Sequence, residues 1–218
     1  MLLKRDLDSI QKDLSDYDQI REQVFTISRT AVRLAGTSIL EIHRGDMKTA
    51  ASTIKEAWKV LEHIEEVAKA HTELLTSPSV TVAYQEFVEA SSLFEFVEKG
   101  KVPSLRETGA SYRSYILGLL DVIGEFRRMA LNSLRKGGVA NAEKLLDLME
   151  GVYEDLQGLE HTSIIPTFRV KMDVARKIIE STRGDVVTEV RRYALEQALD
   201  RVGKRLTIKS SHQISNES

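Results

Sequence analysis

The sequence lacks cysteine altogether and contains few turn-forming residues, with 3 prolines and 12 glycines among 218 residues. Without cysteine, neither a disulfide framework nor a thiolate metal site can form. A fold of many short strands needs far more proline and glycine in its turns. The composition therefore favours helices, and nothing in it requires an oxidising compartment.

Long hydrophobic runs and a strong net charge are also missing. No apolar run approaches the ~18–20 residues that a membrane-spanning helix needs, and residues 1–5 (Met-Leu-Leu-Lys-Arg) do not begin an apolar signal region. We therefore expect a cytoplasmic protein with no membrane partner. The formal net charge is -2, so a nucleic-acid-binding surface would need a local basic patch or several assembled subunits.

Apolar residues recur at spacings of three and four almost throughout, which is typical of amphipathic helices. We expect an all-α fold of about seven helices, forming one domain over residues 1–208, with a polar, disordered tail over 209–218. Several of these helices are long for a globular domain, which leaves faces free for other subunits and indicates an oligomer. The expected helices span residues 2–43, 47–75, 80–98, 111–135, 141–157, 162–181 and 184–203, with a short helical turn at 105–108.

Two pairs of acidic residues stand at helical spacing on otherwise apolar faces. Glu86 and Glu89 are three residues apart, and their face continues into the apolar Leu93. Asp121 and Glu125 are four residues apart and are the only charged residues between positions 115 and 126. Both pairs therefore lie on surfaces that would otherwise be buried.

Glycines at positions 118 and 124 flank the second pair. A glycine inside a helix costs on the order of 0.5–1 kcal/mol relative to alanine. Their presence suggests the close approach of a neighbouring backbone or of a ligand.

Four carboxylates that face one another cannot all remain ionised without a cation between them. Oxygen ligands suit Mg²⁺ or Mn²⁺ rather than zinc. We interpret the four acids as candidate metal ligands, which would activate water for attack on a phosphodiester. The alternative is that they are exposed or paired with arginines such as Arg127 or Arg128.

Three segments of the chain resemble a known family. The run 124–133, Gly-Glu-Phe-Arg-Arg-Met-Ala-Leu-Asn-Ser, is similar to the Gly-Glu-x-x-Arg-Met-x-x-Asn-Ser stretch of Trax, the partner of translin. The run 115–121, Tyr-Ile-Leu-Gly-Leu-Leu-Asp, resembles the Trax segment Tyr-Leu-Leu-Gly-x-x-Asp, and 86–90 resembles its Glu-Tyr-Ile-Glu-Ala. The similarity extends from about residue 18 to 199.

The resemblance implies a seven-helix fold that assembles into barrel-like octamers and cleaves single-stranded RNA with Mg²⁺ or Mn²⁺. In it, Glu86, Glu89, Asp121 and Glu125 match the catalytic metal ligands of the Trax endoribonuclease. Translin, the non-catalytic relative, has an apolar residue at the position of Asp121, so the chain resembles the catalytic branch.

Two departures from eukaryotic Trax concern its assembly. The chain has no long insert between residues 98 and 111 and no basic targeting run at its N-terminus. Both indicate a compact prokaryotic or archaeal member that assembles with itself, and a translin-like partner stays an open question.

Binding RNA requires cations near the phosphates. Arg128 lies on the helix face of Asp121 and Glu125, and the family match adds Arg29, His43 and Arg44 as candidate RNA-binding residues.

Two other functions stay open. One is a translin-like protein that binds RNA or single-stranded DNA without cutting it. The other is an all-α nucleoside triphosphate pyrophosphohydrolase, whose second acidic pair is usually Glu-x-x-Asp rather than Asp121-x-x-x-Glu125.

Overall fold

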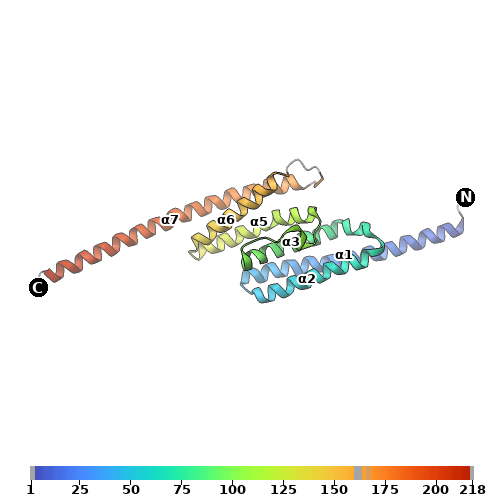
Figure 1. Ribbon diagram of the computed structural model, residues 1–218, viewed down its shortest axis with the longest axis horizontal. Helices are drawn as coiled ribbons and strands as arrows, with labels where there is room; N and C mark the ends of the chain where they lie inside the picture. The colour runs from blue at the N-terminus through green and yellow to red at the C-terminus, as the bar shows by residue number, and fades with distance from the viewer. Residues whose placement is uncertain (1–2, 160–163, 166, 217–218) are drawn as a thin grey trace.

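The computed structural model describes residues 3–159, 164–165 and 167–216, and the side chains of these residues up to position 204. Over this part of the chain it contains seven α-helices, two 3₁₀ turns and no strand, which confirms the all-α prediction (Figure 1). None of the helices described is both long and apolar enough to cross a bilayer. The elements are α1 (Lys4–Arg44), α2 (Met47–Val67), η1 (Ala68–Ala70), η2 (Thr72–Thr76), α3 (Pro78–Lys99), α4 (Leu105–Thr108), α5 (Tyr112–Arg135), α6 (Val139–Gln157) and α7 (Phe168–Asn216).

Most helix ends lie where the sequence places its stop and start residues. α1 ends at Gly45, which has a φ of 81° and so adopts a left-handed conformation that favours glycine. Asp46 then caps α2 by accepting a hydrogen bond of 3.1 Å from the Thr49 amide. Ser111 caps α5 in the same way through the Ser114 amide. These local signals made the boundaries predictable.

The second predicted helix was too long. α2 ends at Val67, and residues 68–76 form two 3₁₀ turns instead of the expected continuation to residue 75. His71, with φ -137° and ψ 67°, interrupts the hydrogen-bond ladder between them. The interruption allows Leu74, which is 3% exposed, to enter the core.

The break predicted at residues 184–185 was also wrong, because α7 is one helix from Phe168 to Asn216. Gly184 lies inside it, where the Thr188 hydroxyl donates to its carbonyl at 2.9 Å. Arg127 on α5 pairs with Asp185 at 3.1 Å, so the residue expected to cap a new helix anchors α7 to the body instead. Residues 209–216, expected to be part of a disordered tail, continue this helix. Residues 162 and 166, near the start of the helix expected over 162–181, lie outside the described residues.

Two apolar clusters form the core, and α3 contributes to both. One cluster joins α3 to α1 and α2, through residues such as Leu61, Ile64 and Phe87. The other joins α3 to α5, α6 and α7, through residues such as Leu93, Phe126 and Met149, and also includes the end of α1. α3 therefore lies centrally, in contact with α1, α2 and α5.

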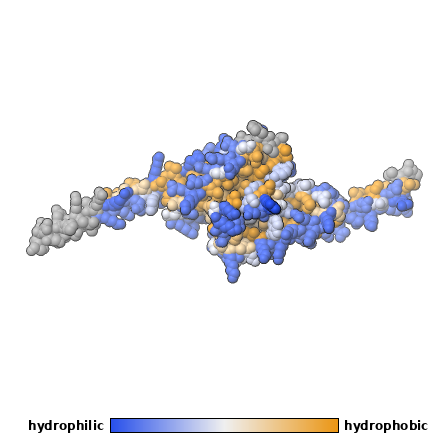
Figure 2. Space-filling model, viewed as in Figure 1, coloured by the Kyte–Doolittle hydropathy of each residue, from blue (hydrophilic) through white to orange (hydrophobic). Residues whose placement is uncertain are grey.

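α1 and α7 project beyond this body in opposite directions (Figure 1). We call residues 3–14, which are the first turns of α1 and its N-cap Leu3, the N-terminal arm. Its apolar residues Leu3, Leu7, Ile10 and Leu14 are between 47% and 69% exposed and follow the four-three-four spacing of a helix-pairing stripe. Figure 2 shows apolar residues along this arm and along the projecting part of α7, where Leu195, Leu199 and Val202 are exposed at the same spacing.

Candidate functional site

The site begins with a close contact between α3 and α5. A Cβ atom added to Gly118 would lie 2.6 Å from the Gln85 carbonyl oxygen and 2.7 Å from Cβ of Val88, closer than atoms can pack. Gly118 therefore allows the two helices to approach as far as backbone contact. This approach brings the acids of α3 next to those of α5.

Glu89 lies within electrostatic range of the other three acids. Burial, and then the neighbouring carboxylates of Glu86, Asp121 and Glu125, raise the pKa of Glu89 to about 8. The pKa of Glu86 is also raised, by burial and then by Asp121. Acidic groups are thus concentrated in a partly buried space between α3 and α5, where the proximity of their neighbours disfavours ionisation.

Asp121 is held by residues from two other helices. The Lys171 ammonium, on α7, forms an ion pair with Oδ1 of Asp121. The Gln85 side-chain amide, on α3, donates to Oδ2 at 2.6 Å. Lys171 also lowers the pKa of both Glu86 and Glu89, so its charge acts on three of the four acids. No local sequence pattern pointed to Lys171, which lies 50 residues from Asp121.

Glu125 is held from the opposite side. His43, at the end of α1, contacts Oε2 of Glu125, and the His43 side chain is only 6% exposed. Arg128, one turn along α5, lies 3.6 Å from the same oxygen. These contacts, of which the His43 hydrogen bond is the strongest, lower the pKa of Glu125. His43, expected to contact RNA, is therefore buried against a carboxylate, whereas Arg128 is half-exposed beside the acids.

The donor chemistry of the site fits a hard divalent cation, although the carboxylates have not converged on one point. Among the described residues, no three acidic or histidine side chains are grouped closely enough to hold a metal ion. Instead, the cationic group of Lys171 lies against Asp121. Oxygen-only donors suit Mg²⁺ or Mn²⁺, and a Cβ added to Gly124 would have no atom within 4 Å, so the surface beside Glu125 is open.

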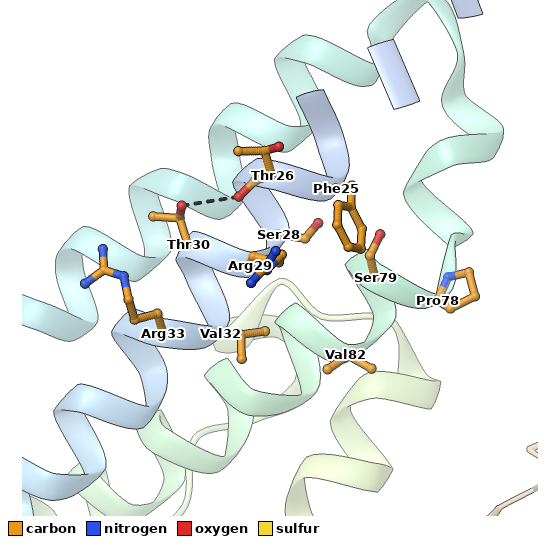
Figure 3. A pocket seen from close by; sticks show the side chains of 10 residues that line it. All are labelled: Phe25, Thr26, Ser28, Arg29, Thr30, Val32, Arg33, Pro78, Ser79 and Val82. Atoms are coloured by element: carbon orange, nitrogen blue, oxygen red, sulfur yellow. Dashed lines mark hydrogen bonds between the residues drawn. The ribbon is translucent and has the colours of Figure 1, made fainter. Parts of the chain in front are cut away.

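Arg29 lies in a separate groove between α1 and the start of α3 (Figure 3). We call it the Phe25 groove. It has a volume of about 880 Å³, and the Arg29 guanidinium carbon lies 5.9 Å from the centroid of the Phe25 ring. Arg44 is exposed at the end of α1, next to His43. The residues lining the groove are Phe25, Thr26, Ser28, Arg29, Thr30, Val32, Arg33, Pro78, Ser79 and Val82.

Comparison with known proteins identifies the family. The profile of the translin family matches residues 18–181. The chain belongs to the translin family. An uncharacterised relative from the archaeon Methanocaldococcus jannaschii is 34% identical over 194 residues, covering 87% of this chain and 85% of the relative.

Two further relatives place this translin family member close to Trax. The translin-associated protein X homologue of Schizosaccharomyces pombe is 21% identical, covering 88% of this chain and 90% of that protein. The structure of AfC3PO in complex with duplex RNA has a TM-score of 0.76 and 28% identity, covering 85% of this chain and 97% of that one. The predicted Trax-like membership and the translin-like helical fold are both confirmed.

Proposed function

We propose that this protein is a Mg²⁺- or Mn²⁺-dependent endoribonuclease that cleaves single-stranded RNA. The observation that carries the proposal is the meeting of two acidic pairs, Glu86 with Glu89 and Asp121 with Glu125, across the α3–α5 contact. Carboxylates held together in a partly buried space favour a divalent cation, because it offsets their mutual repulsion. The open surface beside Glu125 provides access for a substrate.

The four carboxylates would hold the cation. When bound, it supplies a water molecule of lowered pKa and offsets charge on the phosphodiester. Neighbouring side chains of the chain itself have distinct roles around it: His43 fixes the orientation of Glu125, and the half-exposed Arg128 lies where it can bind a phosphate oxygen. Gln85 keeps Asp121 turned toward α3 through its 2.6 Å hydrogen bond.

RNA as the substrate is supported by the family and by the AfC3PO relative, which forms a complex with duplex RNA. Assembly of several copies, which we propose to be an octameric shell, is supported by the exposed apolar stripes of the N-terminal arm and of α7. Such stripes are typical of helices that pair with other helices.

The proposal is tested by incubating the purified protein with end-labelled single-stranded RNA in Mg²⁺, in Mn²⁺ and in EDTA. Internal cleavage is expected with either cation and not with EDTA. The double variant Glu89→Gln/Glu125→Gln should lose at least about a hundredfold in rate. Glu98→Gln, which changes an exposed acid at the end of α3, is the matched control and should retain full activity.

The nuclease proposal would be overturned if the wild type and both variants bound the RNA equally and none of the three proteins cleaved it. That result would favour a translin-like protein that binds nucleic acid without cleaving it. Turnover of nucleoside triphosphates without RNA cleavage would favour the pyrophosphohydrolase instead.

A further inference from the structure

The Phe25 groove exposes apolar surface between two helices. Phe25 on α1 is 46% exposed and Val82 on α3 is 43% exposed, and both line the groove. Pro78 and Ser79 form the end of the groove where α3 begins (Figure 3). Its volume of about 880 Å³ lies within the range of ligand sites.

The groove also contains two cations that no acid neutralises. Within the described part of the chain, neither Arg29 nor Arg33 forms an ion pair, whereas Arg127 and Arg128 each pair with an acid. The Arg29 guanidinium instead rests against the Phe25 ring, an arrangement in which the ring stabilises the cation. An anionic ligand with an apolar, planar part would complement both features.

The groove and the acidic site lie along the same face of α3, and Val82 is the residue of that face that lines the groove. Val82, Glu86 and Glu89 are four and then three residues apart, so they lie in a row on that helix. At the rise of an α-helix, Val82 and Glu89 are separated by roughly 10 Å along its axis. A single extended nucleic-acid strand can bridge such a distance.

We propose that the Phe25 groove is a subsite for single-stranded RNA, in which a nucleobase stacks on Phe25 while Arg29 and Arg33 bind the flanking phosphates. The strand continues along α3 to the acids of the proposed nuclease site. Stacking on an aromatic ring combined with cationic contacts to the backbone is the general way in which proteins bind single strands without sequence preference. The inference rests on the proposed function only in taking RNA as the substrate.

A second copy of the chain is the competing occupant. A second copy would have to place acids directly opposite Arg29 and Arg33, because burying an unpaired charge is unfavourable, whereas every nucleotide of RNA carries a phosphate that can pair with them. The exposed stripes of the N-terminal arm and of α7 already provide helical surfaces suited to pairing between copies. The charge of the groove therefore favours RNA.

The experiment measures binding in EDTA, so that it does not depend on cleavage. The probes are a fluorescein-labelled short oligoadenylate and an abasic oligomer with the same number of phosphates. Phe25→Leu should weaken binding of the oligoadenylate about tenfold and leave the abasic oligomer unchanged. Phe25→Trp should restore binding, Arg29→Met should weaken both probes, and Tyr112→Leu, which changes an exposed aromatic residue on α5, should affect neither.

Equal effects of Phe25→Leu on both probes, or none on either, would overturn the subsite. A fall in the sedimentation coefficient of Phe25→Leu without RNA would show instead that the groove is an interface between copies. Binding that depends on Phe25 without any cleavage in Mg²⁺ or Mn²⁺ would leave the subsite standing and overturn the nuclease proposal.

Discussion

Lys171 places a positive charge from α7 among acids that come from α3 and α5. It pairs with Asp121 and lowers the pKa of Glu86 and Glu89. Without a metal ion it is therefore a counter-ion of the cluster. A divalent cation that takes its place would release the ammonium from Asp121.

Replacing this counter-ion should destabilise the metal-free protein. Lys171→Met leaves the acids without a positive neighbour on α7, so the pKa of Glu89 should rise further and the free energy of unfolding should fall by about 1–2 kcal/mol. The pKa of Glu89 is measured by ¹³C NMR of the glutamate carboxyl carbons, and the free energy of unfolding by urea denaturation in EDTA. Lys177→Met, an exposed lysine on the same helix, should change neither, and an unchanged Glu89 in Lys171→Met would contradict this role.

Glu89 should make stability depend on pH. Its pKa is about 8 in the folded protein against an ordinary value of 4.5. Between these values the unfolded chain releases the proton while the folded protein keeps it, so stability falls as pH rises and levels off above pH 8. Without metal, the free energy of unfolding of the wild type should fall by on the order of 1–3 kcal/mol between pH 5 and pH 8.5, and Glu89→Gln should not show this fall. Urea denaturation at both pH values measures it. If the stabilities of the wild type and of Glu89→Gln changed with pH in the same way, Glu89 would not be the group responsible.

At the residue scale, sequence alone identified the acids and Arg128, which contacts Glu125, but not the contacts that come from distant helices. Glu86, Glu89, Asp121 and Glu125 stood out because charges are rare on apolar helix faces. Lys171 and the pairing of His43 with Glu125 depend on how distant helices pack, and residues 50 and 82 positions apart carry no local signal of contact.

At the element scale, the packing of α3 against α5 depends on one glycine. Gly118→Ala would place a methyl group 2.6 Å from the Gln85 carbonyl oxygen. The helices would have to separate, which should cost about 1–3 kcal/mol of stability and reduce RNA cleavage by moving the acidic pairs apart. Gly124→Ala is the control, because its Cβ meets no atom within 4 Å, and it should be neutral or up to about 1 kcal/mol stabilising. Thermal unfolding measures the stability of both variants. If Gly118→Ala were as stable as Gly124→Ala, the close contact between α3 and α5 would not depend on Gly118.

Helix boundaries were predictable where a capping residue determines them, as at Gly45 and Asp46. They were not predictable where tertiary contacts override a local signal. Gly184 indicates a helix end in sequence, yet α7 continues across it, and Asp185 pairs with Arg127 on α5. The end of α2 depends on the burial of Leu74, which only the folded core reveals.

At the scale of the whole molecule, the N-terminal arm should connect copies of the chain. Its apolar stripe lies outside the body, so Leu7→Lys/Leu14→Lys should change the unfolding free energy of an isolated subunit by no more than ~0.5 kcal/mol. The same change should abolish assembly, because charges would interrupt the stripe. Sedimentation velocity measures this, with Ser9→Lys on the polar face of the arm as control. An unchanged sedimentation coefficient would show that assembly does not use the arm.

Mn²⁺ binding without RNA is the sharpest test of whether acids from α3 and α5 form one cation site. A titration followed by electron paramagnetic resonance should show saturable binding to the wild type and to the Glu98→Gln control. Binding to Glu89→Gln/Asp121→Asn should be at least about a hundredfold weaker, since two of four anionic ligands are lost. If all three proteins bound Mn²⁺ with equal affinity, or if the wild type showed no saturable binding, the acids of α3 and α5 would not form a cation site.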